Sequence, residues 1–135
     1  MLTLEDKSSF YIQIEKAKLL LFDNFNTTYL YGFARNIPSI LFFDERIWSI
    51  RNEVRSYFDA LKKAGIFHTS VESVTKMINQ VGDNPLLWWN GQEVQQARMQ
   101  YCDYFLDHTP NWLKKWNTVL LGLVKNNKDL NDGIK

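Results

Sequence analysis

The sequence predicts an α/β protein: a partial Rossmann-like layer with about three short parallel strands and about six helices. Short apolar runs without polar alternation indicate strands that are covered on both faces. These runs alternate with stretches whose apolar residues recur at helical spacing. Strands that alternate with helices favour a parallel sheet. Because sheets usually have about four to six strands, the layer is either a minimal sheet or the C-terminal portion of a larger doubly wound domain.

A helix and a strand open the layer. Phe10, Ile14 and Ala17 recur at helical spacing, which predicts an amphipathic helix over residues 7–18. The solid apolar run of residues 19–22 predicts the first strand.

The second helix and strand follow a polar turn, residues 23–26. Asn26 or Thr27 can cap the helix, because a short side-chain oxygen accepts hydrogen bonds from the free amides of the first turn. Asn36 fits the C-terminus of this helix. The apolar run of residues 39–43 predicts the second strand.

The third helix and strand are followed directly by a fourth helix. Apolar residues at helical spacing over residues 50–61 predict a helix that ends at Gly65. Residues 66–68 predict a short strand, and Thr69 or Ser70 caps the next helix. The core face of that helix consists of Val74, Met77, Ile78 and Val81.

After breaks at residues 82–85 and 90–91, two more helices are predicted, the second of which starts at Thr109-Pro110 with Pro at its first position. Each has an apolar stripe that is expected to face the core: Val94, Ala97, Tyr101, Tyr104 and Phe105 on one, and Trp112, Trp116, Val119, Leu120 and Leu123 on the other. The prediction is a single partial Rossmann-like domain over residues 1–124 and a flexible polar tail over residues 125–135.

Composition and charge exclude several classes of protein. The net charge of the 135 residues is +1, so no general field attracts nucleic acid. The longest apolar runs have four residues, whereas a membrane span needs about 20, so we expect no membrane span and a cytoplasmic protein. The single cysteine, Cys102, cannot form an intramolecular disulfide and is interpreted as an inert buried thiol. No Cys/His spacing indicates a metal, and no cofactor is expected.

The polar turn after the first strand is the main candidate site. In open α/β sheets, ligands bind beyond the carboxyl ends of the strands, and a helix N-terminus suits phosphate. Asn24, Asn26, Thr27 and Thr28 are therefore candidate phosphate-binding residues. The alternative is that they only cap the helix.

Two further polar residues follow predicted strands. Asp44 follows the second strand and could contact a ligand hydroxyl, although a role in the turn is equally consistent with its position. His68 ends the third strand and could face the same crevice, or it could be structural. Trp88, Trp89 and the Trp112/Trp116 pair could form a stacking platform for a sugar or base, but core packing accounts for their spacing better.

Five segments carry a family pattern: residues 23–30 (DNFNTTYL), 34–44 (ARNIPSILFFD), 57–68 (YFDALKKAGIFH), 88–98 (WWNGQEVQQAR) and 111–116 (NWLKKW). Together they resemble a bacterial family of transferases that is associated with surface-carbohydrate synthesis and is similar to GT-B glycosyltransferases. The first segment is a generic GT-B feature, and the tryptophan-containing segments are more specific. The resemblance covers roughly residues 8–120.

The resemblance implies two Rossmann-like domains with a nucleotide-sugar donor between them, of which this chain is the last part. The phosphate candidates would lie near the donor phosphates, and Tyr31, Asp44 and His68 would contact its ribose or sugar. Tyr31 stands where GT-B proteins usually carry a ribose-binding Glu, and it cannot offer a bidentate carboxylate. The N-terminal domain, which supplies the acceptor site and commonly the catalytic base, is missing from the sequence.

Three functions remain open at this point. The chain is the nucleotide-sugar-binding portion of a glycosyltransferase-like transferase, inactive alone and completed by the missing N-terminal domain or by a homo-oligomer partner. Alternatively, it is a truncated remnant without catalytic activity. The third alternative is a Trp-rich domain that binds a protein partner, since Trp is favoured at interface hot spots.

Overall fold

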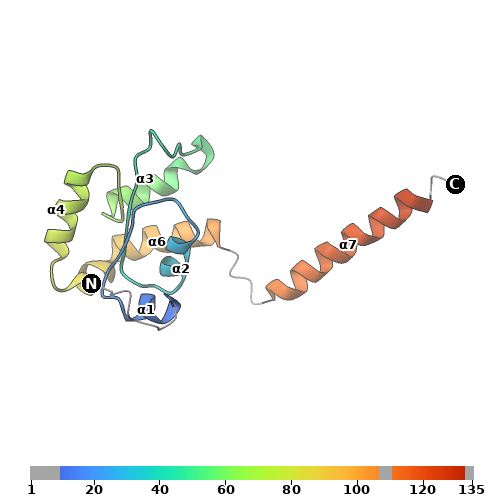
Figure 1. Cartoon of the computed structure of the whole chain (residues 1–135), viewed down its shortest axis with the longest axis horizontal. Coiled ribbons are helices and arrows are strands. Elements are labelled where there is room, and N and C mark those ends of the chain that lie inside the picture. Colours follow the sequence, from blue (N-terminus) through green and yellow to red (C-terminus); the bar gives the residue numbers. More distant parts are fainter. Residues whose placement is uncertain (1–9, 107–110, 133–135) are drawn as a thin grey trace.

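The computed structural model describes residues 10–106 and 111–132 (Figure 1). Its elements in chain order are α1 (Phe10–Lys16), β1 (Leu20–Phe22), α2 (Thr28–Ala34), β2 (Ser39–Phe42), the 3-10 helix η1 (Asn52–Val54), α3 (Arg55–Lys63), β3 (Phe67–His68), α4 (Val71–Val81), α5 (Pro85–Trp89), α6 (Gln92–Phe105) and α7 (Trp112–Asp132). The predicted α/β class is confirmed. Residues 7–9 of the first predicted helix, and the predicted helix start at residues 109–110, lie outside the described residues.

The three strands form one parallel sheet in the order β1-β2-β3. Leu21 pairs with Ile40, and Leu41 pairs with Phe67. Each crossover between neighbouring strands contains one α-helix, α2 or α3, and the second also contains η1. All three strands therefore end at the same edge of the sheet, which is where the sequence predicts a ligand site.

Helices cover both faces of the sheet. The larger core joins the sheet to α2, α3, α5 and α6, and its buried aromatic side chains are Tyr29, Phe33, Phe43, Phe58, Phe67, Trp89 and Tyr101. The smaller core lies under α4 and consists of Ile40, Val74, Met77 and Val81. The predicted core face of α4 is confirmed, and so is its cap, because Ser70 accepts a hydrogen bond from the amide of Ser73. Much of the high aromatic content is thus core.

Two buried tyrosine hydroxyl groups are hydrogen-bond partners inside the larger core. The hydroxyl groups of Tyr29 and Tyr101 lie 2.8 Å apart and share a hydrogen bond. Burial raises the pKa of Tyr29 to about 12 and raises the pKa of Tyr101 further. The neighbouring Cys102 is also buried, as predicted, and burial raises its thiol pKa, as is typical of an unreactive thiol.

The C-terminus of α2 is a Schellman motif. Asn36 adopts a left-handed conformation with φ of 55°, as its type favours. Its amide donates to the carbonyl of Phe33, and the amide of Ile37 donates to the carbonyl of Gly32. The prediction that Asn36 ends this helix is confirmed.

Gly32 lets α2 approach the sheet closely. A Cβ atom at this position would lie 2.9 Å from Oγ of Ser39 and 3.1 Å from a methyl group of Leu20. Ser39 is fully buried and donates a hydrogen bond to the carbonyl of Ile37, so it has little room to move. The glycine therefore permits a helix–sheet contact, which offsets its low helix propensity.

Replacing Gly32 with Ala should lower the free energy of unfolding by about 1–2 kcal/mol, because overpacking against Ser39 outweighs the gain in helix propensity. Urea denaturation measures this difference. Gly122→Ala in α7 is the matched control, since nothing lies within 4 Å of a Cβ atom there, and it should not destabilise the protein. Equal effects of the two substitutions would contradict the close-contact explanation.

The sequence missed α5, whose five residues lie between the two predicted breaks. One and a half turns are too short for helical periodicity to show, and Gly82 and Pro85 indicate a break at its start. Pro85 in fact occupies the first turn of α5. Trp88 and Trp89 lie on this helix, Trp88 partly buried and Trp89 fully buried, so their interpretation as core residues is confirmed.

The core role predicted for the last stripe is wrong. Figure 1 shows α7 extending away from the α/β layer. Side chains of the stripe that the structure describes are 51–58% exposed: Trp116, Val119, Leu120 and Leu123. The spacing correctly indicates an amphipathic helix, but it cannot say whether that face meets the core. The helix continues to Asp132, and the flexibility of residues 125–135 stays a prediction.

Candidate functional site: an aromatic hollow at the carboxyl edge of the sheet

The candidate site is built from the segments that follow β1 and β2. The turn after β1 contributes Phe25, and the loop after β2 runs from Phe43 to Arg51. Because β1 and β2 are parallel neighbours, both segments emerge at the same edge of the sheet. Two hollows lie on opposite sides of the turn after β1.

The first hollow brings together three of the predicted phosphate-binding residues. Asn24, Asn26 and Thr28 line a cavity of about 300 Å³ between α1, β1 and the start of α2. Its other walls are apolar apart from Gln13. The side chain of Asn24 donates to Asp23 at 3.0 Å. The predicted cluster therefore exists, but Thr27 is not among the residues that line it.

The side-chain cap predicted for α2 is wrong. Thr27 is the N-cap residue, but its side chain makes no capping hydrogen bond. Its φ of −65° and ψ of −15° are helical, whereas a capping side chain usually needs an extended N-cap backbone. Only the carbonyl of Thr27 is engaged, as the acceptor for the amide of Leu30. The Thr27 hydroxyl is left exposed at the carboxyl edge.

Tyr31 lies away from the edge, where it joins α2 to α1. Its hydroxyl donates to the carboxylate of Glu15 at 3.0 Å, and Glu15 also pairs with Arg35 at 2.8 Å. The structure thus gives Tyr31 a structural partner. Its predicted contact with the donor ribose stays a prediction.

Asp44 lies at the carboxyl edge of the sheet and forms an ion pair with Arg46. The guanidinium of Arg46 donates to both carboxylate oxygens of Asp44, and the Arg46 amide donates to one of them at 2.9 Å. These hydrogen bonds lower the pKa of Asp44 to about 2. Asp44 therefore remains a charged acceptor at neutral pH, suited to a ligand hydroxyl and unsuited to general-base work. The carbonyl of Asp44 also accepts from the amides of Ile47 and Trp48, which makes it part of the turn.

His68 lines a different hollow from the other candidates. Its imidazole Nε2 lies 2.9 Å from the carbonyl of Gly65, and burial lowers its pKa. The surrounding cavity of about 290 Å³ lies between α3 and α4 and is lined by Lys62, Ser73 and Lys76 among others. The structure does not bring His68 together with the phosphate candidates.

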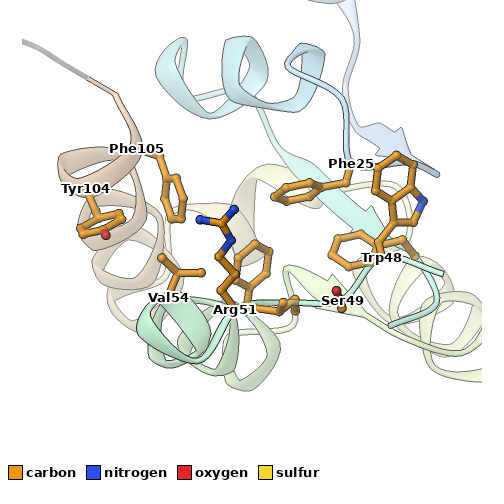
Figure 2. Close-up of a pocket in the computed structure, with 10 residues that line it drawn as sticks. Phe25, Trp48, Ser49, Arg51, Val54, Tyr104 and Phe105 are labelled. Carbon is orange, nitrogen blue, oxygen red and sulfur yellow. The ribbon is translucent and has the colours of Figure 1, made fainter. Parts of the chain in front are cut away.

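The second hollow is larger and mostly aromatic, with a volume of about 370 Å³ (Figure 2). Its walls come from the two edge segments, from η1 and α3, and from the end of α6. The lining residues are Phe25, Phe43, Trp48, Ser49, Ile50, Arg51, Val54, Phe58, Tyr104 and Phe105. A concave, largely apolar cavity with few polar groups is the usual form of a small-molecule site.

The floor of this aromatic hollow is fixed by ring packing. The ring of Phe25 stacks on Tyr29 with centroids 5.4 Å apart and lies 5.4 Å from Phe43 and 5.6 Å from Phe58. Trp48, in contrast, is 43% exposed and reaches over Phe25 at 6.5 Å. A rigid aromatic floor with an accessible indole beside it suits a planar ring that enters from solvent.

Arg51 supplies the cation of the aromatic hollow. Figure 2 shows its guanidinium directed into the space between Phe25 and Phe105. Within the described part of the chain, the side chain of Arg51 has no hydrogen bond or ion pair, whereas nearby Arg55 pairs with Glu45 at 2.9 Å. A guanidinium free in this way can bind a phosphate or carboxylate through two parallel hydrogen bonds.

Sequence reasoning missed the aromatic hollow because it concentrated on polar residues near the strands. Phe25 lies inside the predicted phosphate segment, and Trp48 lies in the loop that begins at Asp44. Aromatic residues in the loops after two neighbouring parallel strands were the available signal. Arg51 has no pattern of its own, and only the path of the loop brings it over the rings.

Two kinds of feature are absent from the described residues: a cluster of metal-ligating side chains and a helix that could cross a membrane. Nowhere in residues 10–106 or 111–132 do three His, Cys, Asp or Glu residues gather as metal ligands would. Over the same residues, none of the helices combines the length and apolar character needed to cross a bilayer.

Comparisons with known proteins identify the family. No curated protein and no solved structure matches the chain significantly. The family model described as LIC12162 family transferase matches residues 1–120. This span contains the whole sheet, both hollows at its carboxyl edge and the first turns of α7. The match covers most of the chain, and the chain therefore belongs to the LIC12162 transferase family.

Proposed function

We propose that this chain is the nucleotide-sugar-binding portion of a glycosyltransferase-like transferase with a GT-B-like arrangement, and that it acts in surface-carbohydrate synthesis. The observation that carries the proposal is the unpaired guanidinium of Arg51, which points into an aromatic hollow at the carboxyl edge of a parallel sheet. Membership in a transferase family supports a group-transfer substrate.

A nucleotide sugar matches the two kinds of surface that meet at this edge. Its base is a flat ring that can stack on the accessible indole of Trp48. Its diphosphate carries the negative charge that Arg51 can neutralise. Asn26, Thr27 and Thr28 follow Phe25 in the chain, but Asn26 and Thr28 line the first hollow, so they would reach the phosphates only from the other side of the turn.

The sugar and ribose hydroxyls need acceptors as well as donors. Asp44 is one candidate, because it follows Phe43 in the chain at the carboxyl edge and keeps its charge at neutral pH, although it is not among the residues that line the aromatic hollow. Tyr31 and His68 are further candidates from the family resemblance, although their present partners are Glu15 and Gly65.

Neither Asp44 nor His68, the two titratable candidates that follow or end a strand, is suited to general-base catalysis. Such a group works best with a pKa near the working pH and within reach of the substrate. The pKa of Asp44 is about 2, and His68 is bonded to the backbone in another hollow. We propose that the chain is inactive alone and that an N-terminal domain or a homo-oligomer partner completes the site.

The test is an NMR titration of isotope-labelled protein with uridine, guanosine and thymidine diphosphate sugars. We expect the largest shifts in the indole resonance of Trp48 and in the amides of residues 26–28 and 51. Free sugars without the nucleotide should shift these resonances little. If none of these nucleotide sugars shifts these resonances, the proposal is refuted.

The alternatives of a non-catalytic remnant or a protein-interaction domain have one observation in their favour. The exposed apolar side chains of α7, including Trp116, leave a surface that a folded protein usually covers. This surface lies on α7, which contributes no residue to the aromatic hollow.

A further inference from the structure

The hollow that contains His68 lies between α3 and α4, beside the edge strand β3, and has a volume of about 290 Å³. Its polar lining consists of Lys62, His68, Ser73, Lys76 and Gln80. None of these residues lines the aromatic hollow or the hollow between α1 and β1. This lysine hollow is therefore a candidate site of its own, near the lower end of the roughly 300–1,000 Å³ that ligand pockets occupy.

The lining of the lysine hollow contains two lysines and no carboxylate. Lys62 lies in the last turn of α3, and Lys76 lies in the middle of α4. Among the described residues neither ammonium group has a hydrogen bond or ion pair, whereas Lys63 pairs with Glu93 at 3.2 Å. Glu72 precedes Lys76 by one helical turn without pairing with it. Two unpaired like charges at one hollow repel each other, so an anion between them would lower the energy.

The imidazole of His68 shows that the charge of one lysine reaches the inside of the hollow. His68 is only 9% exposed, and its Nε2 donates to the carbonyl of Gly65 at 2.9 Å. Burial is the main cause that lowers the pKa of His68, and the positive charge of Lys62 lowers it further. The lysine hollow is thus unfavourable for one more cation, which is the property expected of an anion site.

The two uncharged polar residues of α4 differ in what they can still bind. The hydroxyl of Ser73 donates to the carbonyl of Ser70 at 2.9 Å and accepts from the Ser70 hydroxyl at 3.1 Å, so its proton is already engaged. The side chain of Gln80 is exposed and has no hydrogen bond to any other described residue. Because Gln80 follows Lys76 by four positions, its amide lies on the same side of the helix and adds a neutral donor.

A phosphate monoester has the chemistry that matches this lining. At neutral pH it carries a charge of about −1.5 to −2 and three acceptor oxygens. The ammonium groups of Lys62 and Lys76 can offset that charge, and the Gln80 amide is a third donor group. A single carboxylate would leave one of the two positive charges uncompensated. Phe67 and Met77 are buried and give the hollow an apolar wall for the carbon part of an ester.

We propose that the lysine hollow binds the phosphate group of a phosphate monoester. Lysine binds phosphate as a point charge, and two lysines from different helices fix the phosphate between α3 and α4. This site shares no residue with the aromatic hollow that is proposed for the nucleotide-sugar donor. It therefore stands whether or not a nucleotide sugar binds at Arg51.

The test is an NMR titration of the isotope-labelled full chain with inorganic phosphate, at a constant ionic strength of about 0.15 M. We expect saturable shifts in the imidazole of His68 and in the amides of Lys76 and Gln80. Lys76→Gln should raise the dissociation constant about 10-fold or more, and so should Lys62→Gln, because each removes one charged donor.

Lys63→Gln is the matched control for the two lysine variants. Lys63 is the neighbour of Lys62 in α3, but it is 81% exposed and does not line the hollow. Its replacement removes the same charge and should change the dissociation constant by less than about twofold, because exposed charges are screened by salt. Equal weakening by Lys63→Gln and Lys76→Gln would overturn the proposal.

Two further probes identify what carries the phosphate. Glucose 1-phosphate represents a soluble ester, and vesicles that contain phosphatidic acid represent a lipid headgroup. Binding of either probe that Lys76→Gln weakens and Lys63→Gln does not would support the site and identify the carrier. If inorganic phosphate binds but neither ester does, the hollow holds an adventitious ion only, and the proposal is overturned. It is also overturned if no probe shifts the His68 imidazole, or if acetate shifts it as strongly as phosphate does.

Discussion

Replacing Trp89 with Ala is expected to lower the free energy of unfolding by about 3–5 kcal/mol. The side chain is fully buried, and its ring contacts Phe33 with centroids 6.2 Å apart. Its indole N–H also donates to the side-chain oxygen of Asn36 at 2.9 Å and to the Asn36 carbonyl at 3.1 Å. The substitution would therefore leave both a cavity in the larger core and unsatisfied acceptors at the C-terminal turn of α2.

A loss of this size is a large share of the 5–15 kcal/mol that usually separates folded from unfolded protein. Denaturant titration followed by circular dichroism measures it. Trp89→Phe should cost less, because a ring still fills most of the space and only the hydrogen bonds to Asn36 are lost.

Leu87→Ala is the matched control for the Trp89 prediction. Leu87 lies on the same helix and is 77% exposed, so its removal should change stability by no more than about 0.5 kcal/mol. If Leu87→Ala destabilises the protein as much as Trp89→Ala, the effect comes from the helix α5 itself and not from the burial of Trp89.

The fold could be predicted from the sequence because its elements depend on local patterns. The runs at residues 19–22, 39–43 and 66–68 have no alternation, and they became β1, β2 and β3. Helix α4 combines a cap at Ser70 with a stripe at helical spacing, and both features appear in the structure. A helix as short as α5 has neither signal and was missed.

Burial and partners depend on the whole fold, and sequence spacing does not report them. The stripes of α4 and α7 look alike in sequence, yet one lies against the sheet and the other is exposed. Likewise, Asn26 and Thr28 reached a common hollow because they lie two residues apart at the start of α2, whereas His68 ends another strand and lines another cavity. The guanidinium of Arg51 meets Phe25 only through the path of a loop.

Replacing Arg51 with Gln is expected to weaken nucleotide-sugar binding by about 10- to 100-fold, because a charge-assisted hydrogen bond contributes about 1.5–3 kcal/mol. The stability of the protein should not change, since Arg51 is exposed and its side chain has no partner within the described residues. Isothermal titration with the nucleotide sugar that gives the largest NMR shifts measures the change. The affinity of Arg51→Lys should lie between those of the native chain and Arg51→Gln, because lysine keeps the charge but cannot donate two parallel hydrogen bonds.

Arg35→Gln separates a local contact from a general loss of positive charge. Arg35 follows the end of α2, at the opposite edge of the sheet, and pairs with Glu15 on the surface. Both variants remove one cation, so long-range electrostatics predicts similar losses for the two. A contact in the aromatic hollow predicts a large loss for Arg51→Gln alone. Equal losses, or none, would mean that the diphosphate does not bind at Arg51, and the donor would then have to lie in the first hollow, beside Asn24, Asn26 and Thr28.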